Sequence, residues 1–104
     1  MVIGIREDRL DEYRALHADD HPGVRDLLEK ANMRNFSIFL ARLPDGNLYL
    51  FGCYEYAGDD YDSDMARLAA EPRNEEWLRM TDPMQVPLPG GSSWKLMEEV
   101  YHNP

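Results

Sequence analysis

The chain has 104 residues, of which 11 are Lys or Arg and 20 are Asp or Glu, so its formal net charge at pH 7 is −9. This length suits one domain, residues 1–104, with a single modest core, and a hydrophobic content of 43% is that of a folded chain. The acidic excess argues against binding to nucleic acid or to an anionic membrane surface, because both require a basic face on the protein.

The first part of the chain predicts one strand and two helices. Val2 to Arg6 is a short β-branched run typical of an edge strand. Asp8 is expected to cap a helix that begins at Arg9. Pro22 is expected in the first turn of a second helix, where its missing N–H costs nothing, and that helix should end near Asn32.

The central part predicts a β-hairpin. Phe36 to Leu43 and Leu48 to Tyr56 are β-rich runs of suitable length for strands. Between them, Pro44 to Asn47 has the composition of a tight turn, in which Gly46 supplies a positive φ.

The last part predicts two more helices and a final strand. Asp59 to Ala70 has apolar residues at helical spacing, Pro72 ends this helix, and Asn74 to Met80 forms a short further helix. The prolines and glycines at 83–91 indicate an irregular loop. Trp94 to Tyr101 is predicted to be a strand.

The order β, α, β-hairpin, α, β predicts an α+β domain of the ferredoxin-like split βαβ class. Such a domain has a four-stranded antiparallel sheet with helices on one face. The other face of the sheet stays apolar and uncovered unless something packs on it. We therefore expect a homodimer in which two sheets stack.

Cysteine use and hydropathy bear on the cellular location. Cys53 is the only cysteine, so an internal disulfide is impossible, and its apolar surroundings predict a buried, inert thiol. The N-terminus has no signal-peptide pattern, and no apolar run approaches the roughly 20 residues that span a bilayer. We expect a soluble cytoplasmic protein.

Two histidines suggest a metal site at first sight. His17 and His21 are four residues apart, so on a continuous helix they would share one face and could share a metal ion. Pro22 disfavours helical backbone at His21, and no third His or Cys stands at a recognisable spacing. A solvated helix junction is the favoured interpretation, and a metal-dependent enzyme using His17, Asp20 and His21 is a weaker alternative.

Tyr13 and His17 form a second pair at helical spacing. A phenol beside an imidazole can hold a hydroxylated ligand while one of the two transfers a proton, although such a pair can equally pack at a helix–sheet junction. Flat aromatic faces suit the C–H side of a sugar ring. Each such residue taken singly is more often part of the core. Four of them together could form an aromatic wall for a sugar: Phe36, Tyr54, Trp77 and Trp94.

Four motifs follow one another along the chain: DEYRALH at 11–17, NFSIFL at 35–40, NEEW continued by MTDPM at 74–84, and EEVY at 98–101. They resemble the E-E-Y-x-x-x-H helix, the N-Y-x-I-[FY]-L strand, the tryptophan-bearing helix with its M-T-D-x-M continuation, and the terminal E-V-F strand of the L-rhamnose mutarotases. The resemblance spans nearly the whole chain.

This resemblance implies a dimeric ferredoxin-like protein of the α+β barrel type that interconverts the α and β anomers of L-rhamnose without a metal or a cofactor. By motif, His17 matches the catalytic histidine, Tyr13 a substrate-binding tyrosine, and Trp77 one member of a tryptophan pair. A histidine suits this reaction, because opening a pyranose ring requires an acid and a base near neutral pH.

Three positions depart from the family pattern. Phe36 replaces a tyrosine, His21 replaces a tryptophan before the proline, and Glu76 precedes Trp77, so that the tryptophan pair is incomplete. We expect Phe36, Glu76 and His21 to lie at the substrate site and to affect which sugar is accepted.

The predicted function is that of a sugar mutarotase acting on L-rhamnose or a related deoxyhexose, a small neutral monosaccharide. His17 would transfer the proton, Tyr13 would orient the sugar and Trp77 would stack on its apolar face. Two alternatives stay open because fold does not dictate function: a non-catalytic sugar-binding module of the same fold, and a cofactor-free monooxygenase-type enzyme on a dimeric ferredoxin-like scaffold.

Overall fold

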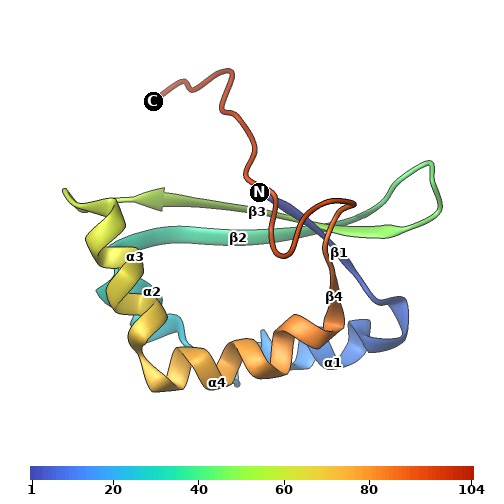
Figure 1. The fold of residues 1–104 in the computed structure, drawn as a ribbon, viewed down its shortest axis with the longest axis horizontal. Helices are drawn as coiled ribbons and strands as arrows, with labels where there is room; N and C mark the ends of the chain where they lie inside the picture. Colours follow the sequence, from blue (N-terminus) through green and yellow to red (C-terminus); the bar gives the residue numbers. More distant parts are fainter.

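Four strands form one open antiparallel sheet in the order β2-β3-β1-β4. The computed structural model describes all 104 residues, and its helices lie on one face of the sheet while the other face carries none (Figure 1). The strands are β1 (Val2–Ile5), β2 (Met33–Arg42), β3 (Leu48–Tyr56) and β4 (Gln85–Val86). The predicted α+β class with a four-stranded antiparallel sheet is confirmed.

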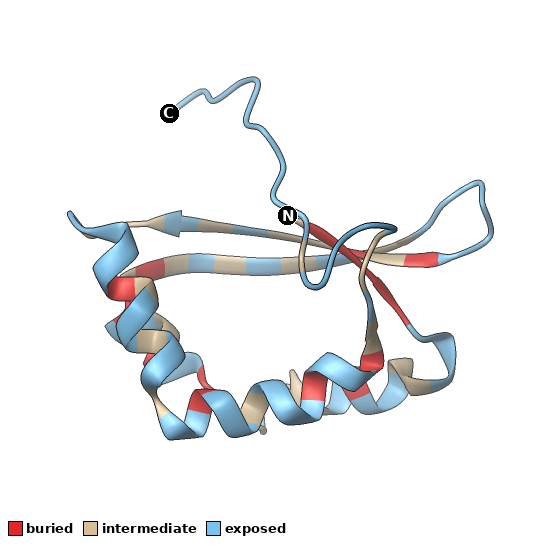
Figure 2. Cartoon of the chain, viewed as in Figure 1, coloured by how far each residue is buried: buried red, intermediate tan, exposed pale blue.

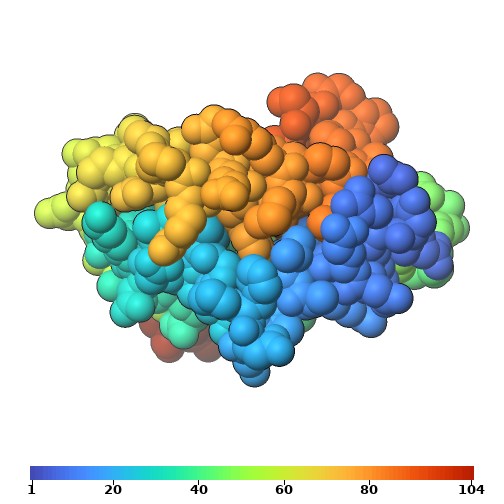
Figure 3. Space-filling view, turned by 90° about the horizontal axis from the view of Figure 1, so that it is seen from below, coloured from blue at the N-terminus to red at the C-terminus, as the bar shows by residue number.

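Four helices and two 3₁₀ turns connect these strands: the turn Glu7–Arg9, α1 (Leu10–Leu16), α2 (Arg25–Lys30), α3 (Tyr61–Ala70), α4 (Pro72–Thr81) and the turn Asp82–Met84. Seen from the helical side, α4 lies beside the α1 and α2 segments (Figure 3). Pro72 begins α4 rather than only ending the preceding helix, because a proline is well suited to the first helical position.

The predicted hairpin is confirmed. β2 and β3 pair from Arg42 opposite Leu48 to Met33 opposite Tyr56, and Gly46 has a φ of +86° in the turn. Exposure alternates along β2 (Figure 2). Ile38 and Leu40 face the helical side, so the exposed Phe39 between them lies on the bare face. The hairpin therefore divides its side chains between the helical face and the bare face.

The core is small and lies where β1 and β3 meet α1. Only 15 of the 104 residues are buried. The main cluster joins residues from the sheet, α1 and the second 3₁₀ turn: Ile3, Ile5, Tyr13, Leu48, Leu50 and Met84. Much of the remaining inner face is thus available to line a cavity.

β1 is a central strand, so the prediction of an edge strand is wrong. β1 pairs with β3 on one side and with β4 on the other. A Cβ at Gly4 would lie 2.7 Å from the Val86 carbonyl oxygen, closer than real Cβ atoms come. The missing side chain of Gly4 lets the short β4 approach, and β4 is a strand that no hydrophobic pattern indicated.

The predicted final strand over Trp94–Tyr101 is also wrong. Lys95 forms an isolated bridge with Val2, and the C-terminal arm (residues 96–104) is exposed throughout and runs out on the side opposite the helices (Figures 1 and 2). A strand needs partners for its backbone groups, and beyond Lys95 the chain pairs with no strand, so the hydrophobic pattern of these residues does not produce one.

Two predictions about helix starts need correction. The Asp8 carboxylate binds the Arg6 guanidinium at 2.7 Å instead of capping a helix. Pro22 precedes α2 instead of lying in its first turn, because Gly23 takes a φ of +53° and delays the helix to Arg25.

Cys53 is exposed, not buried. Its place opposite Ser37 in the hairpin puts it on the bare face of the sheet, where no helix covers it. Separately, every helix of the chain falls short of the length and apolarity needed to cross a membrane.

Candidate functional site

A cavity of about 890 Å³ lies between the inner face of the sheet and helices α1, α2 and α4. Its apolar wall is largely the inner face of the hairpin strands, and its polar side chains come from α1, the segment after it, α4 and β4. Small-molecule sites have this size and this mixture of apolar walls with few polar groups. The cavity brings together most of the site residues expected from sequence.

Tyr13 and His17 lie face to face at the end of α1. Their ring centroids are 4.2 Å apart at 27°, and His17 Nδ1 donates a hydrogen bond of 2.7 Å to the Tyr13 carbonyl oxygen. A carbonyl oxygen only accepts, so the hydrogen of neutral His17 resides on Nδ1. The second ring nitrogen, Nε2, is left as a lone-pair acceptor.

The surroundings of His17 favour its neutral form. Burial lowers the pKa of His17 below its ordinary value of 6.5, the hydrogen bond to Tyr13 opposes this shift, and the positive charge of Arg25 adds to it. Arg25 Nη2 also donates to the carbonyl oxygens of His17 and Ala18, at 3.0 and 3.1 Å, and so holds the turn that follows α1. The imidazole is therefore a base near neutral pH.

The Tyr13 phenol is a hydrogen-bond donor. Its hydroxyl oxygen accepts a hydrogen bond of 3.3 Å from Gln85 Nε2, so its own hydrogen remains free for a ligand. Burial raises the pKa of Tyr13, only partly offset by the Gln85 contact, and the phenol stays protonated. Gln85 lies 72 residues from Tyr13, and no sequence signal pointed to it.

Trp77 of α4 packs near both histidines of the site. Its ring is 5.2 Å from the His17 ring in an edge arrangement and 6.0 Å from the His21 ring. Gly23 makes room for it, since a Cβ at Gly23 would lie 3.3 Å from Trp77 ring carbons. The proline–glycine step before α2 was a sequence signal for this tight approach.

The predicted aromatic wall is present in three of its four members. Phe36, Trp77 and Trp94 line the cavity. Tyr54 instead stacks on Phe36 with ring centroids 5.2 Å apart and supports it from outside the lining. Asn74 and Thr81 line the cavity together with Trp77, and their spacing of three and four residues from it was a helical signal that our prediction missed.

The two remaining predicted site residues, His21 and Glu76, differ in their position relative to the cavity. His21 lines the cavity, whereas Glu76 is exposed on α4 and is not among the lining residues, so its contact with a substrate stays a prediction. α1 ends at Leu16, so His17 and His21 do not share a helical face. No group of three or more His, Cys, Asp or Glu side chains is placed to hold a metal ion.

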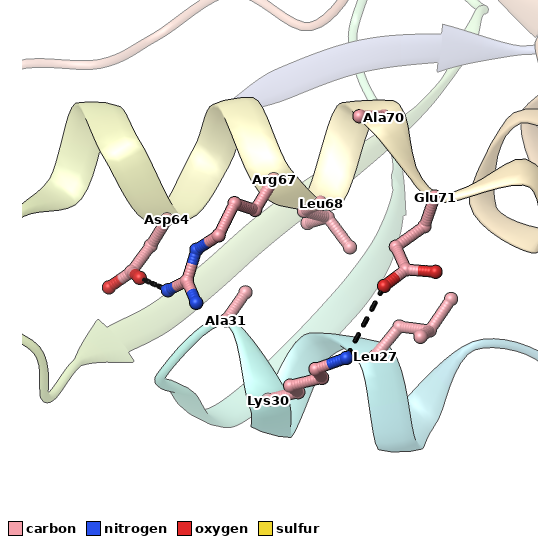
Figure 4. Close-up of a pocket in the computed structure, with 8 residues that line it drawn as sticks. All are labelled: Leu27, Lys30, Ala31, Asp64, Arg67, Leu68, Ala70 and Glu71. Atoms are coloured by element: carbon pink, nitrogen blue, oxygen red, sulfur yellow. Dashed lines mark hydrogen bonds and ion pairs between the residues drawn. The ribbon is translucent and has the colours of Figure 1, made fainter.

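A second cavity of about 340 Å³ lies between α2 and α3 and contains none of the predicted site residues (Figure 4). Its charges are already paired. Lys30 binds Glu71 at 3.4 Å, and Arg67 binds Asp64. It lacks the free polar groups of the larger cavity, which we take as the candidate active site.

Comparison with known proteins agrees with this geometry. The family model of L-rhamnose mutarotase matches residues 1–103 of the 104-residue chain. Among curated proteins, none matches the chain. The family match includes every residue of the cavity wall. The chain belongs to the L-rhamnose mutarotase family, a family of isomerases.

Proposed function

We propose that this protein interconverts the α and β anomers of L-rhamnose or a related deoxyhexose, with His17 as the group that moves the proton. The observation that carries the proposal is the His17 imidazole, whose Nδ1 is held by the Tyr13 carbonyl and whose burial favours the neutral base. Its place in a cavity with Tyr13 and Trp77 supports a pyranose as the ligand.

The reaction needs one proton to travel between two oxygens on the same carbon. His17 Nε2 accepts the proton of the anomeric hydroxyl while the bond between the anomeric carbon and the ring oxygen breaks. The imidazolium then returns this proton to the former ring oxygen, which leaves an open-chain aldehyde. Closure on the other face of the aldehyde reverses these steps, and positioned acid–base help of this kind gives about 10²–10⁴-fold.

The other side chains would hold the sugar. The Tyr13 hydroxyl donates to a sugar oxygen, Trp77 stacks on the C–H face of the ring, and Phe36 makes an apolar contact. His21 lies at the same wall as a further polar contact. A cavity of about 890 Å³ has ample room for a monosaccharide.

Anomer exchange followed by saturation-transfer NMR tests this proposal. Wild type should accelerate exchange of L-rhamnose, and His17→Ala should lower the acceleration by about 10²-fold or more. Asp62→Ala is the control, because Asp62 is exposed on α3 and is not among the residues that line the cavity. Equal exchange by wild type and His17→Ala, no faster than buffer, would refute the proposal, and sugar binding without acceleration would indicate a binding module.

We also propose that the active form is a homodimer. The bare sheet face presents Phe39, with 62% of its surface exposed, and the C-terminal arm presents Leu96 and Val100 at 76% and 89% exposure. Exposed apolar groups in both an arm and a sheet face support a partner that is a second copy, with two sheets stacked.

Two further expectations remain predictions. A cytoplasmic location is supported by the single, unpaired Cys53. The absence of nucleic acid binding is supported by the net charge of −9.

A further inference from the structure

The imidazole of His21 has an unusual environment on the cavity wall. Its Nδ1 is buried and is the buried side-chain polar atom that has no hydrogen-bond partner. Its Nε2 makes no hydrogen bond within the chain and is not buried in this way. Since His21 lines the cavity, Nε2 is the ring nitrogen available to a ligand.

The partnerless Nδ1 determines the tautomer of neutral His21. A neutral imidazole carries one N–H, and on Nδ1 it would be a buried donor without an acceptor, which folded proteins avoid. The hydrogen therefore resides on Nε2, with the lone pair on Nδ1. In this form Nε2–H is the donor that His21, a residue of the cavity wall, has available for a ligand.

His17 has the opposite arrangement. Its Nδ1–H is committed to the Tyr13 carbonyl oxygen at 2.7 Å, so its Nε2 accepts. Both imidazoles contact Trp77, with ring centroids at 5.2 Å for His17 and 6.0 Å for His21. A sugar ring beside Trp77 thus meets an acceptor on one histidine and a donor on the other.

We infer that His21 donates a hydrogen bond from Nε2 to the ring oxygen of the bound pyranose while His17 takes the anomeric proton. This inference rests on the proposed function. When the carbon–oxygen bond of the ring breaks, its electron pair moves to the ring oxygen, and the His21 N–H stabilises the negative charge that develops there. His21 keeps its proton throughout, because the proton that arrives at the ring oxygen comes from His17.

The substrate class follows from this pair of contacts. A reacting sugar must offer a free anomeric hydroxyl to His17 and a ring oxygen to His21. Methyl α-L-rhamnopyranoside has the ring oxygen but no anomeric hydroxyl hydrogen, so it should bind beside His21 without reacting. This glycoside separates the donor role of His21 from turnover.

Two variants test the donor directly. His21→Phe keeps a planar ring and removes the donor, whereas His21→Trp introduces an indole nitrogen that can only donate. We expect His21→Phe to lower the anomer exchange rate by about 10²-fold, and His21→Trp to keep most of it. A merely structural role for the ring would make Phe the better replacement.

Long-range ¹H–¹⁵N NMR of wild type provides a readout that does not depend on activity. It should show His21 with its hydrogen on Nε2 and His17 with its hydrogen on Nδ1, and the methyl glycoside should shift the His21 Nε2–H signal. A His21 hydrogen on Nδ1, an unshifted signal at saturating glycoside, or a folded His21→Phe as active as wild type would overturn the inference. Exchange by wild type no faster than buffer would instead refute the proposed function, and the tautomer and the glycoside shift would still decide the donor role.

Discussion

At the scale of single residues, hydrogen bonds decide which atoms of Tyr13 and His17 are free to donate or to accept in the candidate site. The Tyr13 carbonyl holds His17 Nδ1 at 2.7 Å, and Gln85 holds the Tyr13 hydroxyl at 3.3 Å. One contact frees an acceptor nitrogen and the other frees a donor hydrogen. Two groups four residues apart at the C-terminal end of α1 thus acquire complementary roles from neighbours that differ in chemistry.

The lowered pKa of His17 predicts a pH dependence of the exchange rate. The neutral imidazole is the active base, so the rate should be constant at neutral pH and fall on acidification, with its midpoint below the ordinary value of 6.5 because burial lowers this pKa. Exchange rates measured between about pH 5 and pH 8 check this. A midpoint above 6.5 would contradict the direction of the shift.

The same shift has a consequence for stability. The unfolded chain takes up a proton on His17 more readily than the folded chain does. The contribution of His17 to the free energy of unfolding is therefore present above pH 6.5 and is lost as pH falls through the lower pKa of the folded state. The free energies of unfolding of wild type and His17→Gln, measured with urea across this range, should therefore differ less at acidic pH than at neutral pH. Parallel pH dependences would contradict it.

Phe36 provides a prediction about specificity. Phe36→Tyr adds a hydroxyl at the cavity wall, and one new hydrogen bond to the sugar is worth about 1 kcal/mol, or about fivefold in kcat/KM. We expect the ratio of kcat/KM between L-rhamnose and other deoxyhexoses to change by about this factor. Phe39→Tyr, on the bare face of the sheet, should leave the ratio unchanged, and an equal change in both variants would exclude a role of Phe36 in recognition.

At the scale of elements, the segment between α1 and α2 determines where Trp77 lies. Arg25 holds the turn through two carbonyl oxygens, and Gly23 takes a φ of +53° at a point where a Cβ would lie 3.3 Å from Trp77 ring carbons. Only glycine combines this backbone conformation with the absence of a Cβ at the point of contact. The aromatic wall therefore depends on backbone conformation as much as on the aromatic residue itself.

Gly23→Ala tests this dependence. The left-handed φ costs about 1–2 kcal/mol for alanine, and the new Cβ would lie 3.3 Å from Trp77. We expect lower stability in urea unfolding together with altered Trp77 fluorescence and weaker sugar binding. Gly46→Ala is the matched control, because Gly46 has a φ of +86° but nothing within 4 Å, so it should lose stability without affecting Trp77. Identical fluorescence changes in both variants would contradict the contact.

At the scale of the whole molecule, the chain leaves one sheet face and one arm without an intramolecular partner. The sheet is open, with β2 and β4 at its edges, and 15 of 104 residues are buried. A small chain gains stability by burying such surfaces against a second copy. In the proposed dimer, the net charge of −9 on each chain belongs to the solvated exterior.

The proposed dimer predicts the effect of a charge on the bare face. Phe39→Glu places two carboxylates in a symmetric apolar interface and should shift the protein from dimer to monomer by at least tenfold in dissociation constant, as measured by analytical ultracentrifugation. Removal of residues 96–104 should act in the same direction. Ala66→Glu adds the same charge on the exposed side of α3 and should leave the assembly intact. A monomeric wild type would refute the dimer.

Much of the local structure was predictable because local periodicity follows backbone geometry. The hairpin, with Gly46 in its turn, and the pairing of Tyr13 with His17 both arise from spacing along the chain. The motif resemblance also indicated the family correctly. Cys53 was predicted wrongly because its exposure depends on which sheet face the helices cover.

The sequence by itself determined the α+β class, the hairpin and the pair of side chains at the end of α1, since each depends on the order or the spacing of residues along the chain. Only the tertiary structure decided that β1 is central, that the C-terminal arm has no partner, and that Gln85 reaches Tyr13 across 72 residues. It also decided that His17 and His21 meet at Trp77 although no helix joins them. These features depend on which segments far apart in the sequence contact one another, and tertiary packing rather than local backbone preference decides those contacts.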